Sequence, residues 1–184
     1  SILFTLGFSE REQELARIAG YMHDIGNSVN RVDHAHTGAI LAYNILKDMN
    51  MEVSDRTDIM MAIGNHDEKN GVPVSVLGSA LIIADKSDVR RSRVRNIDFA
   101  TFDIHDRVNY SVEESSLEIC DDKKEIRLKL KIDISISSLM DYFEIFLDIC
   151  FHIFPLSFII PIFPPINSRY SCTMYRGLSA SKLR

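Results

Sequence analysis

The sequence Tyr21-Met22-His23-Asp24-Ile25-Gly26-Asn27 places a histidine and an aspartate side by side where a run with helical apolar spacing meets a glycine. Adjacent residues on an ideal helix point about 100° apart, so both side chains can face one ion only near a helix end. Gly26 supplies that end, and the last-turn carbonyls favour a bound cation because they carry the negative end of the helix dipole. The stretch predicts a cation site, with a buried histidine beside a capping aspartate as the simpler interpretation.

Three further groups of imidazoles and carboxylates follow, each at the edge of an apolar, helix-like segment. They are His34 with His36, then Asn65-His66-Asp67-Glu68, then Ala84-Asp85-Lys86-Ser87-Asp88. Asp85 directly follows a strongly apolar run, where an ionised carboxylate is costly unless it is paired or binds a metal ion. A salt bridge to Lys86 or to an arginine is the alternative. Four separate elements therefore offer candidate metal ligands.

The order and spacing of these residues resemble the HD superfamily of metal-dependent phosphohydrolases. The matching motifs are His23-Asp24-Ile25-Gly26, His34-x-x-x-Gly38-Ala39, His66 and Ala84-Asp85-x-x-Asp88. The resemblance covers residues 6–95, and the adjoining segment to Asp148 looks like the tail of a bacterial HD-domain branch. It implies a helical bundle and hydrolysis of a phosphate ester. The superfamily includes nucleotidases, cyclic-nucleotide phosphodiesterases and triphosphohydrolases, so the substrate stays open.

The resemblance also implies a ligand set for one or two divalent ions. His23, Asp24 and Asp85 would hold the principal ion, and Asp24 could bridge to a second ion supported by His34 and His66. The family histidine four residues before the glycine falls on His34, so His36 is interpreted as a supporting or solvated residue. Imidazoles and carboxylates without thiolates suit Mn²⁺, Fe²⁺, Ni²⁺, Mg²⁺ or Zn²⁺ and do not select among them. The ion would activate a water for attack on phosphorus.

Asp24, His66 and Lys69 are the candidate catalytic residues, and Lys69, Arg90 and Arg91 are the candidate phosphate contacts. Arginine offers a planar fork that matches phosphate oxygens. A run of arginines is otherwise usually a solvated helix face, and that interpretation stays open here. Asp67 and Glu68 are expected to be loop acids, either of which could reach a metal-bound water.

Two departures from the family pattern keep a second function open. HD proteins generally carry one more histidine on a helix well before the His-Asp pair, a position that would fall before Ser1. Some relatives have two adjacent histidines where this chain has Asn65-His66. The alternative is a catalytically incomplete HD-like regulatory module that binds a nucleotide or a protein partner. In the enzyme interpretation the partner is a small phosphorylated substrate.

Start and stop signals predict four helices in this region. Ser9-Glu10-Arg11-Glu12 is a capping box for the first, whose apolar face carries Leu15, Ile18, Ala19 and Met22. Asp33 is the candidate cap of the second, with Ala39, Ile40, Tyr43 and Leu46 at helical spacing. Ser54 or Asp55 would cap the third, which carries Ile59, Met60, Ala62 and Ile63. The fourth is expected to run from Val74 to about Arg95, with Asp88 placed to orient a ligand.

Composition fits one core with a small appendage. The chain has 184 residues, 46% hydrophobic and 26% charged. A net charge of −5 argues against a general nucleic-acid binder but not against a small phosphorylated substrate. The three widely spaced cysteines contain no C-x-x-C pair, which favours reduced thiols and a cytoplasmic location.

Residues 96–148 predict a β-β-α appendage. Strict period-two patterning from Ile126 to Ile136 indicates a hairpin with one buried face, turning at Asp121-Asp122-Lys123-Lys124. Ser137 or Ser138 would cap a helix with Met140, Phe143, Phe146 and Leu147 on its apolar face. Such an appendage is typical of a dimerisation or ligand-sensing element, so a homodimer through 96–148 is one expected arrangement. The fold class predicted overall is mainly α.

The last segment, 149–184, does not continue this pattern. Ile149 to Ile166 is nearly all apolar yet contains Pro155, Pro161, Pro164 and Pro165. That length is at the short limit for a membrane span, and four prolines are hard to house in one lipid-exposed helix. An altered or out-of-frame end, an oligomer-forming tail and a membrane anchor remain open, ranked in that order. The tail is expected to be poorly ordered or weakly packed.

Overall fold

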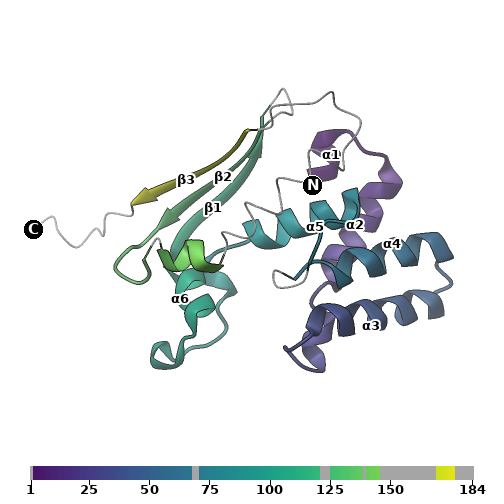
Figure 1. The fold of residues 1–184 in the computed structure, drawn as a ribbon, viewed down its shortest axis with the longest axis horizontal. Helices are drawn as coiled ribbons and strands as arrows, with labels where there is room; N and C mark the ends of the chain where they lie inside the picture. Colours follow the sequence, from purple (N-terminus) through teal and green to yellow (C-terminus); the bar gives the residue numbers. More distant parts are fainter. Residues whose placement is uncertain (1, 68–70, 121–124, 139, 146–168, 177–184) are drawn as a thin grey trace, which may run out of the picture. The chain divides into compact units, whose positions relative to one another are not determined.

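The computed structural model describes residues 2–67, 71–120, 125–138, 140–145 and 169–176. It is mainly helical with a small sheet, which confirms the predicted fold class (Figure 1). The chain forms two compact units, the first reaching Asp85 and the second beginning at Lys86. Residues 86–95, which the sequence pattern groups with the helical segment, belong to the second unit.

The first unit is a group of helices in which α4 packs against both α2 and α3. Its elements are α1 (Ile2–Leu6), α2 (Glu10–Met22), the 3-10 helix η1 (Ile25–Ser28), α3 (His34–Asp48), α4 (Val53–Gly64) and α5 (Val76–Ser87). They enclose one apolar core, formed by Leu15, Ala19, Met22, Ala39, Ala42, Leu46, Ile59, Ala62, Ile63, Leu77 and Leu81. Full burial of each larger side chain contributes about 1.5–3 kcal/mol, so this core fixes the helix ends that carry the site.

Helix α2 begins and packs as predicted. The Glu12 amide donates to Ser9 Oγ at 3.3 Å, and the Ser9 amide donates to Glu12 Oε2 at 2.9 Å. This reciprocal capping box satisfies two amides that the helix itself cannot pair. Leu15 and Met22 are buried on the face toward the core, so α2 delivers its C-terminal end, and His23, to the interior.

Helix α3 confirms its predicted position and its predicted face at Ala39 and Leu46, but not at Ile40, and its predicted cap makes no side-chain hydrogen bond. Asp33 occupies the N-cap position with a left-handed backbone (φ 61°), and its side chain makes no cap hydrogen bond. Ile40, expected on the buried face, is 62% exposed. The buried face carries the predicted Ala39 and Leu46 together with three further small residues, Ala35, Gly38 and Ala42. Small residues occupy this face because η1 and α4 pack closely against it.

Helix α4 begins earlier than the sequence predicts. Its first residue is Val53, and Glu52 occupies the N-cap position without a side-chain cap hydrogen bond. The proposed caps Ser54 and Asp55 are therefore wrong, since both lie inside the first turn. Asp55 pairs with Arg11 of α2, so its carboxylate joins two helices instead of capping one.

The expected single helix from Val74 to about Arg95 is also wrong. Helix α5 ends at Ser87, and Arg90 has extended backbone (φ −164°, ψ 152°) before the short 3-10 helix η2 (Arg91–Arg93). The Oδ1 atom of Asp88 lies 2.9 Å from Arg90 Nε. Its carboxylate takes part in this ion pair, and because α5 ends at Ser87, Asp88 does not lie one turn beyond Asp85 on the same helix. A role of Asp88 in orienting a ligand stays a prediction.

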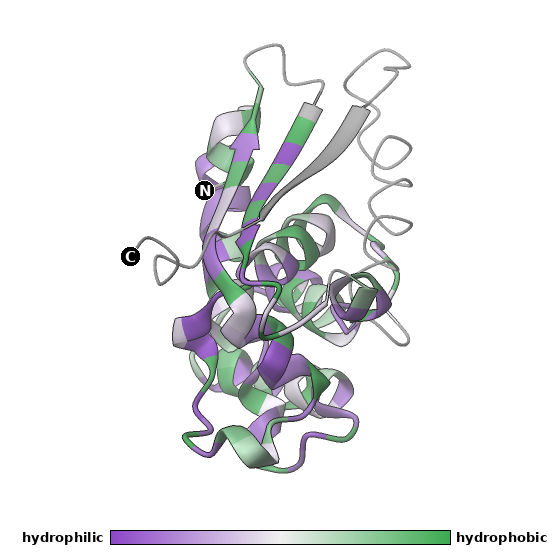
Figure 2. Cartoon of the chain, turned by 90° about the vertical axis from the view of Figure 1, so that its left-hand side faces the viewer, coloured by the Kyte–Doolittle hydropathy of each residue, from purple (hydrophilic) through white to green (hydrophobic). Residues whose placement is uncertain are grey.

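The second unit contains the predicted hairpin and further elements that the sequence pattern did not predict. Strands β1 (Val112–Ile119) and β2 (Glu125–Ile132) pair antiparallel, and Lys129 Nζ lies 2.7 Å from Glu118 Oε1 across them. Polar and hydrophobic residues alternate along both strands (Figure 2). Helix α6 (Ile104–Ser111), preceded by the 3-10 helix η3 (Phe99–Thr101), was not predicted; nor was strand β3 (Arg169–Arg176), which pairs parallel to β2.

The helix after the hairpin is confirmed at its start. Residues 140–145 are helical, and the Asp141 amide donates to Ser138 Oγ at 3.1 Å, as expected of a capping serine. Its buried residues are Tyr142 and Ile145, whereas Met140 is 72% exposed, so the predicted apolar face is wrong at Met140. Strand β2 also ends at Ile132, so Ile134 and Ile136 do not extend its buried face. Phe146 and Leu147 lie outside the described residues.

Strand β3 lies within the tail for which poor order or weak packing was expected. The apolar stretch 149–166, the hairpin turn 121–124 and residues 177–184 lie outside the described residues. Within the part of the chain that the structure describes, no helix is both long enough and apolar enough to cross a membrane.

Candidate metal centre

The His-Asp pair lies at the junction between α2 and η1. His23 is the C-cap residue of α2, and Asp24 immediately precedes η1. A Cβ atom on Gly26 would lie 2.0 Å from the carbonyl oxygen of His34, so only glycine permits this approach of η1 to α3. Gly38 meets the same junction from α3, where an added Cβ would lie 3.2 Å from His23 O. This contact between two backbones brings the His-Asp pair next to the start of α3.

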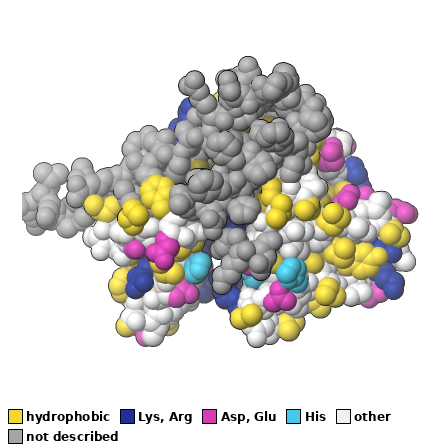
Figure 3. Space-filling view, viewed as in Figure 1, with side chains coloured by type: hydrophobic (Ala, Val, Ile, Leu, Met, Phe, Trp, Pro, Cys, Tyr) yellow, Lys and Arg dark blue, Asp and Glu magenta, His cyan; other side chains and the backbone are white. Residues whose placement is uncertain are grey.

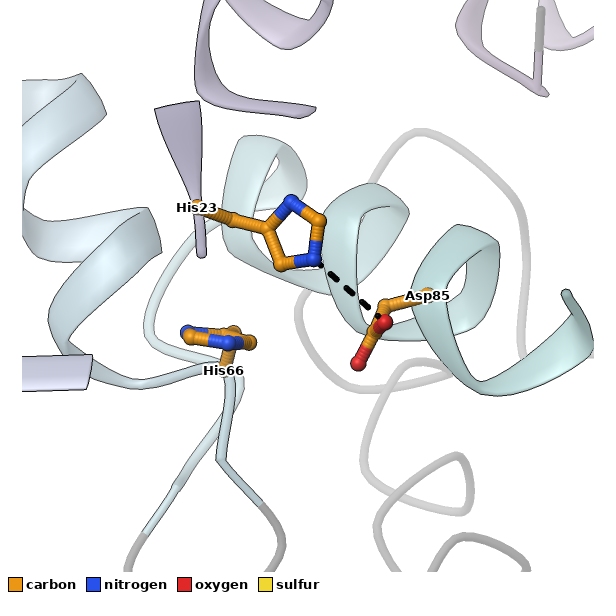
Figure 4. Close-up of side chains that lie close together, drawn as sticks. All are labelled: His23, His66 and Asp85. Atoms are coloured by element: carbon orange, nitrogen blue, oxygen red, sulfur yellow. Dashed lines mark ion pairs between the residues drawn. The ribbon is translucent and has the colours of Figure 1, made fainter. Parts of the chain in front are cut away.

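His23 faces both predicted carboxylates. Its Nε2 atom lies 3.5 Å from Asp85 Oδ1 and 3.5 Å from Asp24 Oδ2. Figure 4 shows the imidazole of His23 directed at Asp85 on α5, with the ring of His66 beside them. The apolar run of α5 therefore ends with its carboxylate at the histidine, and the predicted convergence of positions 23, 24 and 85 is present in the fold.

His34 and His66 complete the cluster from α3 and from the end of α4. His34 Nε2 lies 3.5 Å from Asp24 Oδ1, the carboxylate oxygen that also accepts a hydrogen bond from Asn27. The ring of His66 stands edge-on to both other imidazoles, with centroids 5.1 Å from His23 and 5.2 Å from His34. The two oxygens of Asp24 thus face two different histidines, and His66 lies beside both.

A backbone carbonyl holds each of the three imidazoles in the same way. The Nδ1 atoms of His23, His34 and His66 lie 2.8, 3.1 and 2.6 Å from the carbonyl oxygens of Gly20, Arg31 and Ile63. Since a carbonyl only accepts, Nδ1 carries the proton in each ring. Nε2 is then the ligand atom, as in metal-binding histidines whose other nitrogen donates to a backbone carbonyl.

These residues fit a divalent cation. Two groups of three have ligand atoms that all lie within 4.8 Å of one another: His23 with His66 and Asp85, and Asp24 with His34 and His66. His23 Nε2 is buried without a hydrogen-bond partner, although buried polar atoms are normally paired. A cation at the centre would satisfy this nitrogen and neutralise the carboxylates.

Burial is graded across the cluster. His66 is 2% exposed, and the side chain of Asp85 is 10% exposed, whereas that of Asp24 is 46% exposed. The His66–Asp85 side is therefore enclosed, and Asp24 marks the side from which solvent or a substrate reaches the cluster.

The pKa of His23 lies above its ordinary value. Burial by itself lowers this pKa, because it penalises the charged imidazolium. The attraction of the Asp85 carboxylate, 3.5 Å from Nε2, outweighs burial, with smaller contributions from the Gly20 carbonyl and from Asp24. The carboxylates thus favour a positive charge at the position where a cation would bind.

Among the described residues, the other predicted site residues belong to neither ligand group. His36 is exposed and lies 2.5 Å from Asp33 Oδ1 through Nδ1, which agrees with its interpretation as a solvated residue. Arg90 and Arg91 belong to the second unit, where Arg91 stacks on the Tyr110 ring at 4.6 Å and donates from Nε to the Tyr110 carbonyl. Asp67 is described in the turn after α4, and Glu68 and Lys69 lie outside the described residues.

The carbonyls of Gly20, Arg31 and Ile63 are functional groups that sequence reasoning missed. No side-chain identity marks these carbonyls, but their constant position three residues before each histidine could have been used to predict them.

On the face drawn in Figure 3, basic side chains lie among acidic and hydrophobic ones where the described residues are visible.

The chain is similar to an uncharacterized protein of Methanocaldococcus jannaschii, with 28% identity over 147 residues. The match covers 76% of this chain and 54% of the relative, so the chain spans about half the length of the curated relative that it matches. No protein-family model matches the sequence, and no solved structure matches it. The name of this relative gives no activity, so the function of this chain is inferred from the chemistry of the cluster.

Proposed function

We propose that this chain is a metal-dependent phosphohydrolase of the HD type that cleaves a phosphate ester of a nucleotide-like substrate. One observation carries the proposal: three imidazoles with carbonyl-fixed Nδ1 atoms converge with two carboxylates from α2, η1, α3, α4 and α5. A helix end alone can orient one such ring, but it does not bring three Nε2 atoms and two carboxylates together. The arrangement is the one expected of a preorganised metal site.

The side chains of the cluster would bind the metal ion, and Asp24 would leave one side of the site open to solvent. His23, His34 and His66 offer Nε2, while Asp24 and Asp85 supply two negative charges. A bound divalent cation supplies Lewis acidity toward a phosphoryl oxygen and lowers the pKa of water. Asp24 is the half-exposed member, so it would meet the substrate and hold a proton from the attacking water.

The donor set favours a catalytic role over a structural one. Structural zinc is normally closed by cysteine thiolates, and none is part of either ligand group. A catalytic centre keeps a side open to solvent, as the exposure of Asp24 does here. Mn²⁺, Fe²⁺, Ni²⁺, Mg²⁺ and Zn²⁺ all accept imidazole and carboxylate ligands to different degrees. The contacts of Lys69, Arg90 and Arg91 with phosphate, the cytoplasmic location and a homodimer through 96–148 stay predictions.

A regulatory module is the second candidate, and one observation favours it. Asn65 precedes His66 and donates from Nδ2 to the Met61 carbonyl at 2.9 Å. Its side chain therefore caps the end of α4 instead of adding a ligand to the cluster. A centre with few ligands would bind a nucleotide through its metal without hydrolysing it.

Metal analysis and phosphate release distinguish the two functions. The whole chain is loaded with Mn²⁺, dialysed and tested against a panel of nucleoside mono-, di-, tri- and cyclic phosphates. We expect retained metal and phosphate release in the wild type, and both lost in Asp24→Asn. Asp33→Asn is the matched control, because Asp33 is exposed, pairs with His36 and belongs to neither ligand group.

Retained metal and nucleotide binding without hydrolysis would favour the regulator. A wild-type protein that retains no metal, or an Asp24→Asn variant with undiminished phosphate release, would refute the proposed site.

A further inference from the structure

The backbone of Arg31 lies close to the open side of the histidine cluster. Its carbonyl oxygen accepts a hydrogen bond from His34 Nδ1 at 3.1 Å, and His34 Nε2 lies 3.5 Å from Asp24 Oδ1. One imidazole ring therefore separates the Arg31 backbone from Asp24, the half-exposed carboxylate of the cluster. Because an arginine side chain is longer than a histidine side chain, the guanidinium is long enough to reach a group bound at Asp24.

The loop that carries Arg31 has a backbone fixed by hydrogen bonds. The Asn30 amide donates to the Gly26 carbonyl at 3.2 Å, and Asn30 Oδ1 accepts from the Val32 amide at 2.9 Å. The His34 amide donates to the Arg31 carbonyl at 3.4 Å. The point from which the Arg31 side chain extends is therefore set by the same contacts that place His34.

The side chain of Arg31, by contrast, is exposed and forms no ion pair or hydrogen bond within the described part of the chain. Asp33, the nearest acidic residue in the sequence, pairs instead with His36 Nδ1 at 2.5 Å. A guanidinium presents a planar fork of N–H donors that matches two oxygens of one phosphate group. Arg31 thus offers an unused anion-binding group beside the proposed cation site.

The other basic side chains of the first unit are less well placed. Among its described lysines and arginines, only Arg31 has a backbone carbonyl that holds a ring of the cluster. Arg11 is engaged in ion pairs, and Arg56 lies over the ring of Tyr43, 5.0 Å from its centroid. Lys47 lies in the last turn of α3, a 15-residue helix, roughly 20 Å from the helix start at the cluster.

The direction of the helices favours an anion on the same side. Helices α2 and α4 end at the cluster, whereas α3 begins there, three residues after Arg31. A helix end favours cations and a helix start favours anions, because of the helix dipole. The start of α3 therefore adds to the positive potential of the Arg31 side chain.

We propose that Arg31 binds the terminal phosphoryl group of a phosphate monoester at the proposed metal site. This inference rests on the proposed function and narrows its substrate class. The guanidinium fork engages two phosphate oxygens, which leaves a third for the cation. A terminal phosphoryl group has three non-bridging oxygens, whereas a diester or a cyclic phosphate has two.

Calorimetry of the Mn²⁺-loaded whole chain with inorganic phosphate tests this inference, with dimethyl phosphate as the diester probe. We expect inorganic phosphate to bind more tightly than dimethyl phosphate. Arg31→Gln should weaken phosphate binding by about tenfold or more, equivalent to about 1.4 kcal/mol. It should change the Mn²⁺ dissociation constant by less than about threefold, because the contact with His34 uses the Arg31 carbonyl.

Arg17→Gln is the matched control, since it removes the same charge from an exposed position on α2. It should leave the affinities for phosphate and for Mn²⁺ close to those of the wild type. Arg31→Lys keeps the charge but not the fork, so it should recover only part of the lost phosphate affinity. Circular dichroism of each variant separates a lost contact from a lost fold.

Undiminished phosphate binding by Arg31→Gln would overturn the inference, as would an equal loss in Arg17→Gln or equal affinities of the wild type for the two probes. A wild type that binds no phosphate would also overturn it. Phosphate binding that depends on Arg31, without phosphate release from any nucleotide, would refute the hydrolase alone. Phosphate release by a chain whose phosphate affinity does not depend on Arg31 would refute the inference alone.

Discussion

Two of the three carbonyls that accept a hydrogen bond from a site histidine lie at helix ends, and the same physical reason explains both contacts. Gly20 and Ile63 lie in the last turns of α2 and α4, where backbone carbonyls have no amide partner four residues on within the helix. The Ile63 carbonyl also accepts from the backbone amides of Asn65 and His66 just past the helix end. A histidine just beyond such an end can donate Nδ1 to the carbonyl three residues before it. This hydrogen bond gives the carbonyl a donor and, at the same time, directs the Nε2 atom of the histidine away from the helix end.

The candidate ligands could be predicted from residue types, but their grouping could not. The spacing of His23-Asp24, His34, His66 and Asp85 is visible in the sequence, and the fold brings these residues together. That His66 lies between His23 and His34 depends on how α4 packs against α2 and α3, which no local pattern encodes. The choice of His34 over His36 agrees with the contacts, because only His34 lies beside Asp24.

The raised pKa of His23 predicts opposite pH dependences for the metal-free and metal-loaded chain. Because the folded pKa exceeds the unfolded one, the His23 charge stabilises the metal-free protein fully below the ordinary pKa of about 6.5. This contribution is lost as the pH rises through the raised folded pKa. Metal binding needs neutral imidazole, so Mn²⁺ affinity should increase over the same range.

Urea unfolding of the chelator-treated wild type and of His23→Gln at several pH values from 5.5 to 8.5 measures the first effect. The free energy of unfolding of the wild type, relative to the variant, should decrease with rising pH. Calorimetry with Mn²⁺ measures the second effect. A relative stability that stays constant or increases with pH would show that His23 is not charged in the folded metal-free chain.

At the scale of elements, the close contact between η1 and α3 sets the geometry of the site. Gly26→Ala would force a Cβ atom to within 2.0 Å of the His34 carbonyl, so the two backbones must separate. We expect a loss of stability of roughly 2 kcal/mol or more, in the range of overpacked sites, and at least a tenfold weaker hold on Mn²⁺ because His34 moves away from Asp24.

Gly20→Ala is the matched control. Gly20 lies within α2, and an added Cβ would have no atom within 4 Å. Alanine there should raise stability by about 0.5–1 kcal/mol through helix propensity and unfolded-state entropy. Thermal unfolding and Mn²⁺ calorimetry on both variants provide the comparison. If Gly26→Ala binds Mn²⁺ as tightly as the wild type, the contact does not position the ligands.

The ends of helices and strands could be predicted where a short sequence motif determines them. The Ser9 capping box and the β1–β2 hairpin depend on spacing within a few residues, and both are confirmed. Helix α5 ends at Ser87, whose carbonyl accepts a hydrogen bond from Ser115 Oγ, 28 residues further along the chain. Strand β3 pairs in parallel with a strand 37 or more residues earlier. Such long-range contacts leave no periodic trace in the sequence.

At the scale of the whole molecule, the two compact units should respond differently to metal. All five candidate ligands lie at or before Asp85, in the first unit. A ligand that binds only the folded state stabilises it by about 2.7 kcal/mol at a free concentration of 100 times the dissociation constant. This stabilisation should slow exchange of the most protected amides of the first unit by up to about 100-fold.

Hydrogen exchange measured by mass spectrometry, with and without Mn²⁺, resolves this difference along the chain. Added Mn²⁺ should increase protection in α2, α3, α4 and α5, because their ends carry the ligands, and leave β1 and β2 nearly unchanged. Asp24→Asn should lose most of the gain, whereas Asp33→Asn should keep it. A gain of equal size in β1 and β2 would mean that metal stabilises the chain as one cooperative body. A gain confined to the strands would place the metal outside the histidine cluster altogether.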